Sequence, residues 1–117
     1  MTSTPSTTTI IPAPPVVPWA ESVRVQPGNE LDRPQATAYL TFDIRPDLAE
    51  GGGAVAIEWD LSYVDGQWVP DEDPMIVADD APVGDIGVEQ ARGFARALLA
   101  AADALEEIRR GSQEGTA

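Results

Sequence analysis

Residues 54 to 69 read AVAIEWDLSYVDGQWV, and this stretch decides the fold. Its large apolar side chains stand at every second position: Val55, Ile57, Trp59, Leu61 and Tyr63. A period of two over this length is typical of a strand with one buried face. Asp65-Gly66 suits the two central positions of a type I′ hairpin turn, because both need positive φ. Residues 67 to 69 are then expected to return as an antiparallel strand, which Pro70 ends.

Further strands are expected on both sides of this hairpin. Residues 36 to 44 place five apolar side chains on one face: Ala36, Ala38, Leu40, Phe42 and Ile44. Residues 19 to 26 also alternate, and their apolar side would hold Trp19, Glu21, Val23 and Val25. Residues 75 to 78 fit a fifth, short strand. The alternation therefore predicts an antiparallel meander of three to five strands.

The C-terminal segment predicts a helix from about residue 88 to residue 110. At about 100° per residue, one wide face is apolar and consists of Ala91, Phe94, Leu98, Ala101, Ala102, Leu105 and Ile108. Gly111 is a typical residue for a helix end, and the preceding arginines suit the negative end of the helix dipole. Leu99 lies on the opposite, arginine-rich side, either as an ordinary exposed leucine or as a small dimer contact.

These elements predict a two-layer α+β domain, in which the helix packs on one face of the sheet. Residues 1–18 are expected to be a disordered Thr/Pro-rich tail, residues 19–111 the domain, and residues 112–117 a second tail. An alternative for the N-terminal segment is an arm that docks on a partner through Ile10, Ile11, Val16 and Val17. The predicted core is Val23, Val25, Leu40, Phe42, Val55, Ile57, Trp59, Leu61, Phe94, Leu98 and Leu105.

Composition argues against catalysis and against cofactors. The chain contains no cysteine, histidine or lysine, and all seven basic residues are arginines. The chain therefore lacks a thiolate or amine nucleophile, the commonest general base near neutral pH and the commonest transition-metal ligand. The acidic loop at residues 71–80 does not fit a calcium-binding EF-hand, since Met75 and Ile76 stand where a ligand and a glycine are required. We expect no enzyme activity, no cofactor and no metal site.

Charge is the most informative feature for function. The net charge is -13, and residues 43 to 85 contain twelve acidic residues and one basic residue, Arg45. Such a balance disfavours direct binding to nucleic acids and to anionic membranes, and it favours a partner protein with a basic surface. The simpler alternative is that the acidity only keeps the protein soluble. The candidate partner-binding residues are Asp43, Glu58, Asp60, Asp71, Glu72 and Asp73.

The segment from Ile86 to Asp103, IGVEQARGFARALLAAAD, carries a resemblance. It is similar to the closing helix of small domains of unknown function from actinobacteria and their phages, over about residues 75–108. The resemblance implies that a strand precedes the helix, and it implies no activity. We therefore expect a cytoplasmic accessory protein that binds other proteins, as a monomer or weak homo-oligomer. The alternatives are a structural component of a phage particle that uses the N-terminal arm, and an acidic nucleic-acid mimic that blocks a basic DNA- or RNA-binding protein.

Overall fold

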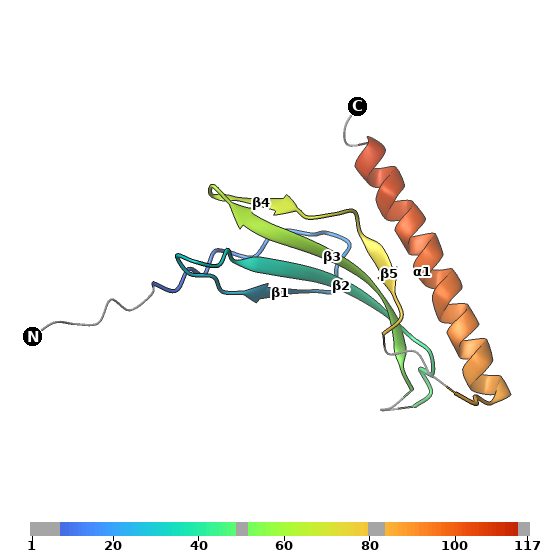
Figure 1. The fold of residues 1–117 in the computed structure, drawn as a ribbon. Coiled ribbons are helices and arrows are strands. Elements are labelled where there is room, and N and C mark those ends of the chain that lie inside the picture. The colour runs from blue at the N-terminus through green and yellow to red at the C-terminus, as the bar shows by residue number, and fades with distance from the viewer. Residues whose placement is uncertain (1–7, 49–51, 80–83, 115–117) are drawn as a thin grey trace, which may run out of the picture.

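The computed structural model describes residues 8–48, 52–79 and 84–114, and it has the expected α+β architecture (Figure 1). The strands are β1 (Ser22–Gln26), β2 (Gln35–Asp43), β3 (Ala54–Val64), β4 (Gln67–Pro70) and β5 (Met75–Val77). They form one antiparallel sheet in the order β1-β2-β3-β4, and β5 pairs with β3. The helix α1 (Val88–Glu114) packs against this sheet.

The β3–β4 hairpin forms as the sequence predicts. Asp65 and Gly66 have φ values of 52° and 81°, so both turn residues are in the left-handed region. Beyond the turn, β4 pairs with the last residues of β3, and β5 pairs with Ala56–Glu58 nearer its start. One edge of β3 thus carries both short strands, while the other edge pairs with β2 from Ala54 to Ser62.

The strand register gathers the apolar side chains on one face. Leu40 lies opposite Ile57, and Phe42 lies opposite Val55. Residues directly opposite each other in an antiparallel pair point to the same side of the sheet. This face, together with Ile44 directly after β2, is the surface that α1 covers.

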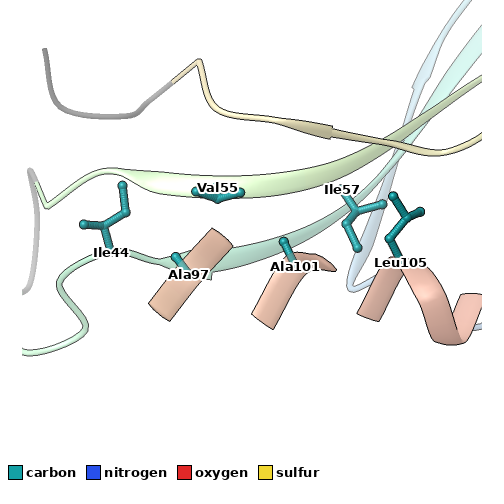
Figure 2. Close-up of a cluster of buried hydrophobic side chains, with 6 residues drawn as sticks. All are labelled: Ile44, Val55, Ile57, Ala97, Ala101 and Leu105. Carbon is teal, nitrogen blue, oxygen red and sulfur yellow. The ribbon is translucent and has the colours of Figure 1, made fainter. Parts of the chain in front are cut away.

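The main core lies between α1 and the β2–β3 pair. Figure 2 shows its six buried side chains: Ile44, Val55, Ile57, Ala97, Ala101 and Leu105. The helix contributes mainly alanines, so its backbone comes very close to the sheet. At Gly93 there is no room for a side chain, since an added Cβ would overlap the carbonyl oxygen of Ile44.

The helix is rotated relative to the sequence prediction. Leu98 was expected in the core, but 37% of it is exposed, and Ala91 and Ala102 are also exposed. The line that faces the sheet is Gly93, Ala97, Ala101 and Leu105, about 60° around the helix from the predicted centre. Small residues repeat every four positions along this line, and close packing against a sheet favours them over a face with larger side chains.

Other parts of the predicted core and helix also differ from the structure. Of the predicted core residues, Val55, Ile57, Leu61 and Leu105 are buried. The remaining ones besides Leu98 are only half-buried, namely Val23, Val25, Leu40, Phe42, Trp59 and Phe94. Among the described residues α1 contacts β2, β3 and β5 but not β1 or β4, which explains the partial burial near those strands. Gly111 does not end the helix, which continues to Glu114.

Residues 8–20, which we call the N-terminal arm, contact the part of the sheet that α1 leaves uncovered. Ile10 forms two backbone hydrogen bonds with Gly28, and the indole Nε1 of Trp68 donates to the carbonyl oxygen of Ala13 at 2.8 Å. Val17 is 8% exposed, and the ring of Trp19 lies 6.2 Å from that of Trp59. Residues 8–18 belong to the segment expected to be a disordered tail, so these contacts with the chain's own sheet are a finding of the structure.

The arm also accounts for burial that α1 does not provide. Ala36, Ala38 and Leu61 are at most 4% exposed, yet none of them belongs to the cluster packed on the helix. They lie on the apolar face towards β1 and β4, the face on which the arm contacts Trp59 and Trp68. Two separate elements, α1 and the N-terminal arm, therefore cover one face of the sheet.

A pair of neighbouring valines tests this role of the arm. We expect Val17→Ala to lower the free energy of unfolding by roughly 1 to 2 kcal/mol, because two buried methyl groups are lost. Val16→Ala is the matched control, since Val16 is 91% exposed. Urea unfolding of the full chain measures both. Equal stability of the two variants would mean that the arm does not pack on the sheet in solution.

Candidate functional site

The sheet face opposite α1 is polar and carries most of the predicted partner-binding residues. Tyr39 lies opposite Glu58, and Thr37 lies opposite Asp60. Because these residues alternate with the buried ones on β2 and β3, their side chains point away from the helix. In the part of the chain that the structure describes, neither α1 nor the N-terminal arm covers this surface (Figure 1).

Hydrogen bonds hold two of the carboxylates in place on this face. The Thr37 hydroxyl donates to Oδ1 of Asp60 at 2.8 Å, and the Ser62 hydroxyl donates to Oδ1 of Asp71 at 2.8 Å. The backbone N–H of Asp71 also donates to the carbonyl oxygen of Asp60 at 2.9 Å, which ties the segment after β4 to β3. Asp60 and Asp71 line the same hollow of about 180 Å³. Glu58, half-buried, stands two residues before Asp60 on β3.

The six predicted residues do not form one surface. The structure brings Asp60 and Asp71 together at one hollow, and Glu58 lies two residues before Asp60 on the same face of β3; we call these three residues the acidic triplet. Asp43 is exposed on the same face, at the far end of β2. Asp73 lines a groove on the helix side of the molecule, and the backbone carbonyl of Glu72 accepts a hydrogen bond from Nε1 of Trp59 at 2.7 Å. This bond turns the segment after β4 towards the apolar face, so the acidic loop is divided between the two sides of the sheet.

The same face contains an arginine and a glutamate that sequence reasoning did not assign to it. The guanidinium of Arg24 on β1 lies 5.8 Å from the ring centre of Tyr39, and Arg24 lines the hollow beside Asp60. Glu21, expected on the apolar side with Trp19, is exposed, and its carboxylate accepts hydrogen bonds from the N–H and hydroxyl of Thr41. The cross-strand pairing of β1 with β2 is the signal that places Arg24 beside the triplet.

A second feature is an apolar groove on the helix side. It has a volume of about 860 Å³, and its lining includes Val17, Trp19, Trp59, Pro74 and Ile108. The arm, the segment after β4 and the last turns of α1 each contribute one wall. Sequence analysis missed this groove because it exists only when the arm is docked.

Shifted pKa values occur away from both features. Arg45 and Asp47, in the turn after β2, form a two-pronged ion pair with distances of 2.9 and 2.6 Å. The hydrogen bond from Arg45 lowers the pKa of Asp47, and the same bond raises the pKa of Arg45. Both groups are near the surface, so this pair organises a turn and does not indicate acid–base chemistry.

Within residues 8–48, 52–79 and 84–114, no three His, Cys, Asp or Glu side chains gather closely enough to hold a metal ion. The same residues hold no helix with the length and apolar character needed to cross a membrane. Comparison of the chain with known protein families, with curated proteins and with solved structures finds no match.

Proposed function

We propose that the chain is a non-catalytic interaction protein whose acidic sheet face binds the basic surface of another protein. The observation that carries this proposal is the acidic triplet, Glu58, Asp60 and Asp71, on a face that the described part of the chain leaves open. We further propose that it serves as an accessory protein of an actinobacterium or an actinophage, on the resemblance of its helix.

The physical argument is one of charge fixed in position. Carboxylates on paired strands keep their spacing, and the hydrogen bonds from Thr37 and Ser62 restrict two of them further. Fixed charges lose little side-chain entropy on binding, and complementary charges speed the encounter between partners. Arg24 and Tyr39 beside the triplet add donors and an aromatic surface, which are common in binding interfaces.

A second candidate function is mimicry of nucleic-acid phosphates, as an antagonist of a basic DNA- or RNA-binding protein. It is favoured by Asp43, Glu58 and Asp60, which lie on the rigid β2–β3 pair and not in loops. The third candidate, a phage structural protein with a threading arm, has less support, because residues 10–19 contact their own sheet.

Neutralising two carboxylates of the triplet tests the proposal. We expect the double variant Glu58→Gln, Asp60→Asn to recover much less of its basic partners from a lysate of the host. The association rate should fall more than the dissociation rate rises, because exposed charges mainly steer encounter. The fold is expected to persist, because Asp60 is exposed and glutamine keeps the size of the half-buried Glu58; circular dichroism of the double variant checks this.

The matched control is Glu30→Gln, Asp32→Asn, which removes the same charge from an exposed turn between β1 and β2. Capture should be measured for all three proteins at low salt and at physiological salt, where the Debye length is about 8 Å. If the triplet variant and the control recover the same partners in the same amounts, the sheet face is not the recognition surface.

A further inference from the structure

The N-terminal arm meets the β3–β4 hairpin at an aromatic pair. Trp68 on β4 packs edge-on against Tyr63 on β3, with the ring centres 5.1 Å apart. The indole Nε1 of Trp68 donates to the carbonyl oxygen of Ala13, which lies within the proline-rich segment PAPP at residues 12–15. Aromatic rings form the surface on which proline-rich segments dock in several classes of peptide-binding domain. The contact therefore has the chemistry of proline-rich peptide recognition within one chain.

The exposure of the arm follows the three-residue repeat of a polyproline II helix. Pro12 and Pro15 are half-buried, while Ala13 and Pro14 between them are exposed. A polyproline II helix has three residues per turn, so positions 12 and 15 share one side of it. Prolines also lack the N–H groups that a strand needs, and residues 11–17 are not part of a strand in the structure. The arm thus meets the sheet as an extended proline-rich ligand would.

The arm can leave without disturbing the sheet. Backbone hydrogen bonds at Ile10, the indole bond to Ala13 and the burial of Val17 hold it in place. A turn, in which the N–H of Ala20 donates to the carbonyl oxygen of Val17 at 3.0 Å, joins it to β1. Because the arm is not one of the five strands, its departure leaves the pairing of β1 to β5 intact. Another segment with the same chemistry can then replace it.

We propose that the Tyr63–Trp68 pair, with the apolar sheet face beside it, binds an extended proline-rich segment of another protein, and that residues 12–15 fill this site until such a segment displaces them. The arm itself identifies the occupant, since it shows that the site accepts an uncharged segment with prolines three residues apart. Such segments lose little conformational entropy on binding, because they are already extended. The site lies on the sheet face opposite the acidic triplet, so this proposal does not rest on the proposed function.

The docked arm should weaken the binding of any competing segment. A ligand binds only the fraction of molecules whose arm is released, and its apparent dissociation constant is the intrinsic value divided by that fraction. Replacement of Pro12 and Pro15 by alanine removes the two half-buried rings and the fixed φ of both positions. This double variant should therefore release its arm more often than the parent chain and bind a separate peptide more tightly.

Peptide binding to the full chain tests the site. The probe is a fluorescent peptide with the sequence TTIIPAPPVVP of residues 8–18, and its anisotropy reports binding. We expect the variant Pro12→Ala, Pro15→Ala to bind the probe at least about fivefold more tightly than the parent chain does. Adding Trp68→Phe to this variant should weaken binding about fivefold, since phenylalanine keeps a ring but loses the N–H donor. Pro14→Ala is the matched control and should bind like the parent, because Pro14 is exposed.

A second probe and a mass measurement complete the test. The same peptide with alanine in place of the prolines at positions 12 and 15 should bind much more weakly. Circular dichroism should be unchanged for every variant, because the prolines lie outside the sheet and phenylalanine retains an aromatic ring beside Tyr63. If the variant Pro12→Ala, Pro15→Ala fails to bind the probe at about 1 millimolar, or binds both probes equally, the proposal is wrong. A parent chain that sediments at twice 12.4 kDa at about 100 micromolar, but not after Trp68→Phe, would identify the occupant as the arm of a second copy and overturn the assignment to another protein.

Discussion

Replacement of Gly93 by alanine is expected to lower the free energy of unfolding by about 1 to 3 kcal/mol. An added Cβ would overlap the carbonyl oxygen of Ile44, which is backbone and cannot rotate away. The helix would have to move off the sheet, and the contacts of Ala97 and Ala101 would loosen with it. Helix propensity acts in the opposite direction, since alanine is favoured over glycine by about 1 kcal/mol, so the measured sign shows which effect is larger.

Gly111→Ala is the matched control in the same helix. An added Cβ there meets nothing within 4 Å, so only the propensity term remains. This variant should be more stable than the parent by roughly 0.4 to 1 kcal/mol. Thermal and urea unfolding of both variants, monitored by circular dichroism, provide the comparison. If both substitutions stabilise the protein, the helix does not approach β2 as closely as the structure has it.

Ile57→Ala is expected to have the largest effect of any single truncation, about 2 to 5 kcal/mol. Ile57 is fully buried on the central strand, between Leu40 on β2 and Ile76 on β5, and under Leu105 of the helix (Figure 2). A domain of this size has a total stability of about 5 to 15 kcal/mol, so the loss would be a large fraction of it. The midpoint of urea unfolding should fall, with an unchanged slope.

Leu98→Ala serves as the control for the rotation of the helix. Because 37% of Leu98 is exposed and it lies outside the core cluster, its truncation should cost less than about 1 kcal/mol. The helix orientation expected from sequence predicts the reverse, with Leu98 buried and as costly to truncate as Ile57. Comparable losses for the two variants would therefore contradict the orientation in the structure.

The sequence alone was enough to predict the secondary-structure elements and their α+β architecture. The alternation at Val55, Ile57 and Leu61 and the Asp65-Gly66 turn are local features, and local sterics and side-chain direction suffice to interpret them. The helical repeat of apolar side chains also predicted the C-terminal helix. Packing of this helix on the sheet followed, because the apolar face of each has to be buried.

The tertiary structure decided the details that involve two surfaces at once. Both Leu98 and Ala97 fit an apolar helical face, and only the close approach of Gly93 to Ile44 selects the line of Ala97. Composition predicts an extended N-terminal segment, but whether it packs depends on the part of the sheet that the helix leaves open, and on an indole at Trp68 that can reach Ala13. The acidic loop is divided between the two faces, because the backbone carbonyl of Glu72 accepts from Trp59 on the apolar face and the carboxylate of Asp71 accepts from Ser62 on the polar face. Periodicity reports only which face of an element is apolar, and the shape of the opposing surface determines which of those residues are buried.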